Sequence, residues 1–551
     1  MTSRSLHRCV SSSLIALGLV ACTLDERATG TIPLPPAQQA ESPVEVELDA
    51  AAEADASAAE PVLDASEPAA VDTPALPPAV RMQPPAQAED AGAPQPPPPP
   101  PPPPPPDAGP GPVQPTVCQV DCTKFVDIAT RLRLIVEDLR ALDPPELRGN
   151  VRYLDLTNYA NAGHGVQQLD LYREAIAYAI NSLSRGPIVV LPQAIDAQGL
   201  LFRIRLSDYG WTQASWEALV AQYPYGVKYD ADSRTFPIDD AALETLLAQL
   251  GTQTPYIQAD WFFSHAVRPP LYYTLLGVPA NLKDLEAQLG VSIADDIQSG
   301  RIARAGFQES GPSHFNRVIE RHALGERGAL WLTYDFDAGS GFSNIITHPL
   351  DFRHASSELL FSLANGLHGY MVVDARGARL DKAPNAAVQD MQASDSAIES
   401  GISCTNCHLE TGVNVQHDEL RDAVRLFGTD VQATDAILAL YKDDATLDAL
   451  FDTDSQRYRA ALTATRLREF TDGSAHSLDD AFAGLLRARD VASVLGLEER
   501  QLLAVINSSP GVFPPEALAL RVPGATLARD RFESKFAQFV GALGLGVSRR
   551  K

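Results

Sequence analysis

Five consecutive residues carry the strongest chemical signal in the sequence. They read Cys404, Thr405, Asn406, Cys407 and His408. Two thiols three residues apart share one turn of backbone, so each can form a thioether with a vinyl group of haem, and the imidazole that follows directly can bind the iron. The pattern is the attachment signature of c-type haem. It predicts one covalent haem c held by Cys404 and Cys407, with His408 as the proximal iron ligand.

Two other kinds of site use a cysteine pair of this spacing. A structural zinc site needs four ligands, and the next candidate is His417, with no second Cys pair to complete the set. A redox-active dithiol of the thioredoxin kind follows a buried strand, whereas residues 397–403 show no strand-like run. We therefore favour haem over zinc and over a dithiol.

The distal ligand of the haem iron stays open. A single-haem electron carrier usually adds a Met or a His on the distal side. No Met follows His408, but Met371 and Met391 precede it, and His417 and His476 follow it. Met371 also suits the core of a strand, and His417 also suits an exposed helix start. A vacant or water-bound position is a further alternative.

A second cysteine pair, Cys118 and Cys122, has no His after it. We expect a small local disulfide at the start of the folded body, because export to an oxidising compartment favours one. Metal binding or redox chemistry is the alternative, although no further ligand is nearby in the sequence.

The N-terminus has the pattern of an export signal that ends in a lipid-bearing cysteine. Arg4 and Arg8 precede an apolar run over residues 14–21, which is too short to span a membrane. Residues 19–22 resemble the lipobox of bacterial lipoproteins, which implies a signal peptide over residues 1–22 and a diacylated Cys22. An ordinary signal with a chance Cys is the alternative. Lipidation would anchor the protein in the cell envelope, facing the periplasm or the cell surface.

Residues 23–117 have a composition that does not support a hydrophobic core. They hold 15 acidic and 2 basic residues, so this segment carries half of the net charge of −26, and they include an unbroken proline run over residues 96–106. Such a segment predicts a disordered, extended Pro-rich acidic linker. Nothing in the chain is basic enough to predict nucleic-acid binding.

The elements that position the motif fall into two predicted regions, an α+β region over residues 118–390 and an all-α, cytochrome c-like haem domain over residues 391–551. Helical spacing covers residues 167–183, and hairpins are predicted between 188–191 and 200–206 and between 358–363 and 370–373. After residue 391, helical spacing recurs over residues 420–426, 434–441, 458–465, 478–485 and 531–543.

Several short stretches resemble a family of large single-haem c-type cytochrome proteins of unassigned function, associated with planctomycetes and myxobacteria. The resemblance covers most of residues 150–450 and implies a c-type cytochrome without naming a substrate. Its matching residues are 183–184, 208–211, 223–226, 260–262, 268–272, 304–307, 320–322, 348–350, 365–367 and 401–404.

These stretches contain polar residues that invite two interpretations. Either they form a pocket near the haem, or they form buried ion pairs and helix caps, which is the more frequent role of charged residues in mixed domains. The residues are Asp260, Arg268, Arg304, Arg317, Arg321 and His322.

Taken together, the sequence predicts single-electron transfer at a membrane surface, with a redox partner protein that the sequence does not identify. One alternative is a haem-dependent oxidoreductase of the peroxidase kind, with residues 118–390 forming the pocket and His322 or Arg321 acting on a bound oxidant. Another is a haem-based sensor or binding module.

Overall fold

The computed structural model describes residues 124–307, 312–313, 315–337, 345, 348–390, 396–427, 431–467 and 477–550. Several predictions fall outside these residues: the signal peptide with Cys22, the linker over residues 23–117, the pair Cys118 and Cys122, and the ligand candidates Met391 and His476. No helix among the described residues is long and apolar enough to cross a membrane.

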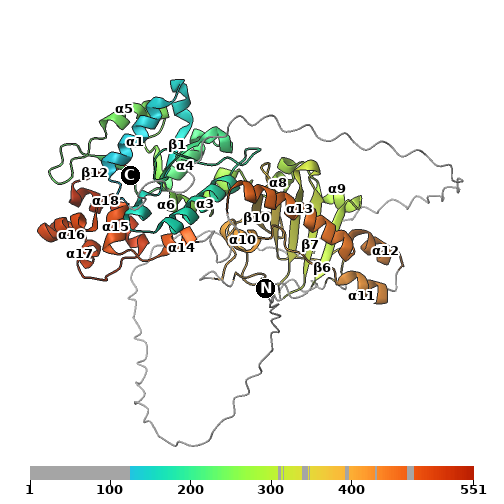
Figure 1. The fold of residues 1–551 in the computed structure, drawn as a ribbon. Coiled ribbons are helices and arrows are strands. Elements are labelled where there is room, and N and C mark those ends of the chain that lie inside the picture. Colours follow the sequence, from blue (N-terminus) through green and yellow to red (C-terminus); the bar gives the residue numbers. More distant parts are fainter. Residues whose placement is uncertain are drawn as a thin grey trace, which may run out of the picture. The chain divides into compact units, whose positions relative to one another are not determined.

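A four-stranded mixed sheet organises the first part of the described chain (Figure 1). Its order is β2-β3-β1-β5, with β1 parallel to β5 and antiparallel to β3. Helix α1 begins after Asp127, whose carboxylate accepts a hydrogen bond from the N–H of Thr130, and its apolar residues recur at helical spacing. The bounds are α1 Ile128–Ala141, β1 Val151–Asp155, α2 Thr157–Asn161, α3 Val166–Ser182, β2 Gln193–Ala194, β3 Leu201–Arg205, α4 Gln213–Gln222, β4 Val227–Tyr229, α5 Ala241–Leu250, β5 Tyr256–Gln258, α6 Ala259–Ala266 and α7 Leu271–Leu276.

The helix predicted over residues 167–183 is confirmed as α3, but the first predicted hairpin is only partly right. Its turn and second strand form, whereas the first strand is β2 at residues 193–194 rather than 188–191. The Asn181 side chain accounts for the difference, because its amide bonds both the N–H and the C=O of Val190 and so occupies groups that a strand would need.

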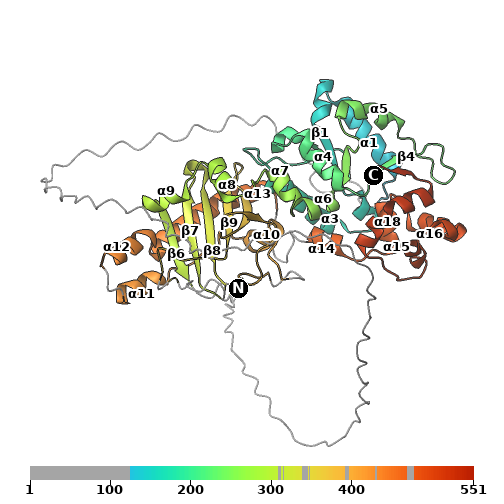
Figure 2. The same ribbon diagram turned by 180° about the vertical axis from the view of Figure 1, so that it is seen from behind.

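A six-stranded antiparallel sheet follows, in the order β11-β10-β9-β8-β7-β6 (Figure 2). The predicted hairpin across Asn365 and Gly366 is confirmed as β9 and β10. Both faces are buried, which explains why these strands lack a simple polar–apolar alternation. The bounds are α8 Leu282–Leu289, α9 Ile293–Gln298, β6 Ile302–Phe307, β7 Arg317–Ala323, β8 Ala329–Asp335, β9 Ser356–Ser362, β10 His368–Asp374 and β11 Arg379–Leu380.

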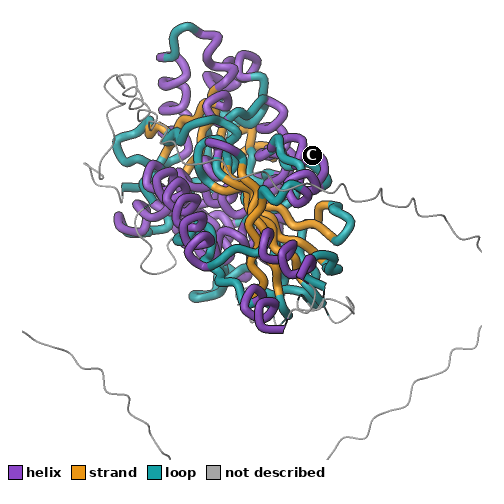
Figure 3. Tube along the Cα trace, turned by 90° about the vertical axis from the view of Figure 1, so that its right-hand side faces the viewer, coloured by secondary structure: helices purple, strands orange, loops and turns teal. Residues whose placement is uncertain are grey.

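The two faces of this sheet meet different helices (Figure 3). On one face, which we call the α13 face, Trp331 stacks on Phe451 of α13 with ring centroids 4.7 Å apart. On the opposite face, Ile302 and Val318 pack in a separate apolar cluster with residues of α11 and α12. Cross-strand pairing places Tyr370 on the α13 face, in line with Leu360 and Trp331.

The five helices predicted after residue 391 form, as α11, α12, α13, α14 and α18, although α13 begins well before residue 458. The bounds in this part of the chain are α10 Ile402–His408, α11 Leu420–Phe427, α12 Val431–Leu440, α13 Asp444–Ala464, α14 Ser477–Ala483, α15 Ala488–Val494, α16 Glu499–Ser508, α17 Pro515–Ala519 and α18 Arg529–Leu543. This part of the chain is not purely helical, however, because β12 (Gly546–Ser548) pairs antiparallel with β4.

The expected boundary at residue 390 does not coincide with a break in the packing. One apolar core contains Ile135 of α1 and Trp261 of α6 together with Phe451 of α13 and Phe539 of α18. The reason is that the apolar faces of α13 and α18 are covered by elements that precede residue 390.

Candidate functional site

The Cys-Thr-Asn-Cys-His motif forms helix α10, whose start is set by close packing. Gly401 precedes the helix with φ +91°, a backbone conformation that favours glycine. A Cβ at this position would also meet the carbonyl oxygen of Val267 and lie 3.0 Å from the Tyr272 ring. Glycine therefore lets the motif begin directly against α6 and α7.

The two cysteines of the motif are free thiols. Cys404 is half-buried and Cys407 is exposed. Burial raises the pKa of the Cys404 thiol. Both side chains are unpaired thiols, the form from which a thioether can be made.

His408 is oriented by its own chain. Its Nδ1 atom lies 2.7 Å from the carbonyl oxygen of Gly412, and because a carbonyl only accepts, Nδ1 carries the proton. The lone pair is then on Nε2, the atom that can bind a metal. Burial lowers the pKa of His408, which favours the neutral imidazole.

Four buried tyrosines from four elements surround α10, and we call them the tyrosine group: Tyr178 of α3, Tyr272 of α7, Tyr370 of β10 and Tyr458 of α13. The Tyr370 ring lies 6.0 Å from the His408 ring at 27°. The Tyr272 hydroxyl accepts a hydrogen bond from the N–H of Tyr370, and the Tyr458 hydroxyl donates to the carbonyl oxygen of Leu409. Burial raises the pKa of Tyr178 to about 12. The group holds α10 in place and gives it apolar surroundings.

Charged residues on the α13 face form ion pairs near the motif. Arg317 donates hydrogen bonds to Asp335 and to Glu358, at 2.7 and 3.0 Å. Glu358 and Arg317 act in opposite directions on the pKa of Cys407 and of His408. Arg317 and Glu358 therefore lie close enough to the motif to act on it electrostatically.

The residues around α10 fit a covalently attached haem. The donor set consists of two unpaired thiols and a neutral imidazole with its Nε2 lone pair available. Three buried polar atoms near the motif, Tyr370 Oη, Glu358 Oε1 and Asn406 Oδ1, have no hydrogen-bond partner among the described residues. A haem propionate is an acceptor that such a hydroxyl can use. Over the described ranges, no group of three or more His, Cys, Asp and Glu side chains is arranged to hold a metal ion.

Of the distal-ligand candidates, Met371 is placed on the wrong side. Strand residues alternate, so Met371 points to the face of β10 opposite Tyr370, where it is buried and aligned with Leu359 and Leu332. Met371 is therefore directed away from Tyr370 and from the His408 ring beside it. His417 lies on the surface with 59 % of its side chain exposed, and its Nε2 is 3.3 Å from Asp448.

His368 is a residue near the motif that the sequence reasoning missed. It is buried on the same face of β10 as Tyr370, and its ring stacks on Tyr458 at 4.3 Å. Burial lowers its pKa to about 3, so it is a neutral imidazole. The sequence could have placed His368 on the same face as Tyr370, because residues two apart on a strand share a face and Tyr370 lay in the predicted hairpin.

The polar residues of the matching stretches do not form one pocket. Arg317 lies next to the motif, and Arg268 is 3.6 Å from Glu399 just before it, whereas the others form ion pairs and hydrogen bonds elsewhere. The partners are Asp260 with Asn158, Arg268 with Asp479, Arg304 with Glu320, Arg321 with Asp454, and His322 with Glu320 and Asp296.

This arrangement removes the roles suggested for His322 and Arg321 in an oxidant-processing enzyme. His322 is fully buried between two carboxylates on the face of the sheet opposite Tyr370. Arg321 is on the α13 face, but its guanidinium is engaged by Asp454 at 2.8 Å. Neither side chain is directed at α10.

Comparisons of the chain with protein-family models, with curated proteins and with solved structures found no match. The chemistry assigned to α10 therefore rests on its residues and their geometry.

Proposed function

We propose that this chain is a membrane-anchored c-type cytochrome that carries one covalent haem on α10 and transfers single electrons in the cell envelope. The observation that carries the proposal is the combination of two unpaired thiols and an oriented, neutral His408 on one helix. The resemblance to large single-haem cytochrome proteins points the same way.

In this function the haem supplies a centre that gains and loses one electron. The chain's own residues then have separate tasks. The Gly412 carbonyl keeps the His408 ring in one tautomer and one orientation. The tyrosine group keeps water from the side of α10 that it covers, and low polarity there favours the reduced state and raises the reduction potential. The Arg317–Glu358 pair sets the local charge.

The proposed location follows from the N-terminus. A lipid on Cys22 would anchor the chain, and the linker over residues 23–117 would act as a tether for the folded body. The tether lets the haem reach a redox partner protein, whose identity the chain does not reveal.

The decisive experiment is a test of covalent attachment. The protein is produced in a host that attaches c-type haem, denatured, and assayed by the pyridine haemochrome method and by mass. We expect one haem per chain, and none after Cys404→Ala with Cys407→Ala. Cys118→Ala with Cys122→Ala is the matched control and should keep the haem. Loss of all haem from the wild type on acid-acetone extraction would refute the proposal.

The visible spectrum then separates electron transfer from the alternatives. A low-spin, six-coordinate spectrum in both oxidation states supports an electron carrier. A high-spin spectrum favours a haem enzyme or a sensor instead.

A further inference from the structure

Two adjoining cavities lie far along the chain from the haem motif, between α2 and α15. The outer cavity has a volume of about 560 Å³ and the inner one about 270 Å³. They share four lining residues, Ala162, His164, Arg487 and Asp490, so we treat them as one site, the α2–α15 cavity. Its volume is in the range of pockets that bind small molecules.

The α2–α15 cavity lies at a position in the fold that suits a ligand. Strands β1 and β5 are parallel, and the chain leaves their carboxyl ends directly into α2 and α6. Asn158, on the first of these helices, bonds Asp260 on the second at 2.9 Å and also lines the inner cavity. The crevice outside the carboxyl ends of parallel strands is where open sheets bind their ligands.

Two residues that line the inner cavity each carry a buried polar atom without a hydrogen-bond partner among the described residues. Tyr159 is 6 % exposed and Asn158 is 4 % exposed. The hydroxyl of Tyr159 and Oδ1 of Asn158 have no hydrogen-bond partner among the described residues. Because Asn158 uses its NH₂ group on Asp260, its Oδ1 can only accept a hydrogen bond, whereas the Tyr159 hydroxyl can donate one. A ligand that satisfies both needs a hydroxyl donor and an acceptor.

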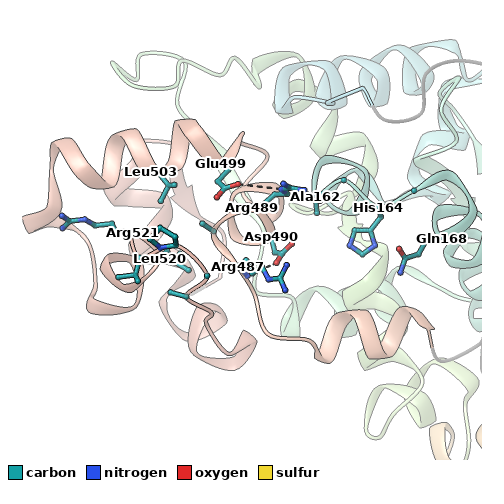
Figure 4. A pocket seen from close by; sticks show the side chains of 17 residues that line it. Ala162, His164, Gln168, Arg487, Arg489, Asp490, Glu499, Leu503, Leu520 and Arg521 are labelled. Carbon is teal, nitrogen blue, oxygen red and sulfur yellow. Dashed lines mark hydrogen bonds and ion pairs between the residues drawn. The ribbon is translucent and has the colours of Figure 1, made fainter.

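The charges around the cavity favour an anion. Arg487, Arg489 and Arg521 line the outer part, against the two carboxylates Asp490 and Glu499. Arg529 lines the inner part, but its Nε donates to the carbonyl oxygen of Phe482 at 2.6 Å and its charge interacts with the buried Asp260. Arg489 is paired with Glu499 at 3.8 Å. Figure 4 shows Arg487 and Asp490 across the cavity from His164 and Gln168. In a chain with a net charge of −26, a concave site with an excess of arginines selects anions.

Aromatic rings form part of the wall. The Tyr159 ring lies 4.7 Å from the His164 ring and 4.9 Å from the Tyr172 ring. The Nδ1 atom of His164 is 3.1 Å from the Tyr172 hydroxyl, and burial lowers the pKa of His164, so this wall is uncharged. Such a wall suits the carbon skeleton of a small polar ligand rather than a bare inorganic ion.

We propose that the α2–α15 cavity binds a small organic anion that carries both a carboxylate and hydroxyl groups, such as a sugar acid. The carboxylate pairs with Arg487, and the hydroxyl groups bond Asn158 Oδ1 and the Tyr159 hydroxyl. The proposed ligand site does not depend on the haem on α10. A negative result for ligand binding would therefore leave the proposed cytochrome function intact.

The test is calorimetric titration of the purified full-length protein with glucuronate. Glucose matches its size and hydroxyl groups without the charge, and inorganic phosphate supplies the charge without the skeleton. We expect saturable binding of glucuronate only. Tyr159→Phe and Arg487→Gln should each weaken it by about tenfold, because each removes one polar contact. Arg500→Gln, at a side chain that is 82 % exposed outside the cavity, should leave the affinity unchanged.

Tyr159→Phe also distinguishes a lost ligand contact from a loss of folding. Its hydroxyl has no partner in the described structure, so the variant should unfold at the wild-type temperature or above. The proposal is overturned if glucuronate does not bind up to about 10 mM, if glucose or phosphate binds as well, or if both cavity variants bind like the wild type.

Discussion

The Nδ1 atom of His408 lies 2.7 Å from the carbonyl oxygen of Gly412, four residues further along the chain. Gly412 has φ +74°, and a Cβ there would lie 3.1 Å from Tyr458 and 3.4 Å from His368. The residue that orients the proposed iron ligand is therefore confined by its backbone conformation and by the two stacked rings beside it.

Gly412→Ala tests this confinement. The added Cβ strains the backbone and crowds Tyr458, so we expect a loss of about 2–3 kcal/mol in the free energy of unfolding. Gly300→Ala is the matched control, because φ is +67° there and nothing lies within 4 Å of the added Cβ, so it should lose only about 1 kcal/mol. Urea unfolding measures both. Equal losses would show that Gly412 is not crowded.

Asp454→Ala tests the link between the six-stranded sheet and α13. Asp454 is 3 % exposed and accepts hydrogen bonds from Arg321 and from the indole N–H of Trp331, both at 2.8 Å. Its removal leaves a buried guanidinium unpaired, so we expect a loss of about 3–5 kcal/mol in unfolding free energy. The exposed Asp452→Ala on the same helix should change it by less than about 0.5 kcal/mol. A small effect at Asp454 in urea unfolding would contradict this account.

Separating residues 391–551 from the rest tests the shared core. We expect this fragment to lack a cooperative thermal transition, because α13 and α18 would lose the apolar partners that cover them and β12 would lose β4. Circular dichroism during heating provides the measurement, with residues 118–551 as the folded control. A sharp, reversible transition of the fragment would show that it is an independent domain.

His265 is expected to contribute to acid sensitivity. Burial is the main cause that lowers its pKa from 6.5 to about 4, and its ring stacks on Trp261 at 4.5 Å. The unfolded chain therefore binds a proton more readily than the folded one, so stability is lost as the pH falls from about 6.5 towards 4. His265→Gln should reduce that loss. Melting temperatures of both proteins across this pH range test it, and parallel curves would exclude the contribution.

Cys22→Ser tests the anchor. If Cys22 carries the lipid, the variant should be released from membranes or remain unprocessed, because no helix among the described residues can cross a bilayer. Membrane fractionation with immunoblotting measures this, and Ser11→Ala within the predicted signal is the control that should stay anchored. A processed Cys22→Ser protein that stays on the membrane would contradict lipidation.

The chemistry proposed for residues 404–408 follows from the sequence alone. Attachment of haem depends on two thiols and an imidazole at fixed spacing along the backbone, and that spacing is a local property of the chain. Helical periodicity likewise predicted α3 and five helices after residue 391 (α11 to α14 and α18), because an apolar stripe with a period of 3.6 residues is visible in one segment at a time.

The surroundings of the motif were decided by the tertiary structure. Tyr178, Tyr272, Tyr370 and Tyr458 come from four distant segments, so no local pattern could bring them together at α10. Strand pairing, rather than composition, directs Met371 away from the motif and His368 towards the Tyr458 ring, since a shift of one residue along a strand reverses the face. The division at residue 390 failed for the same reason: the partners of an apolar face are chosen by packing between segments far apart in the chain.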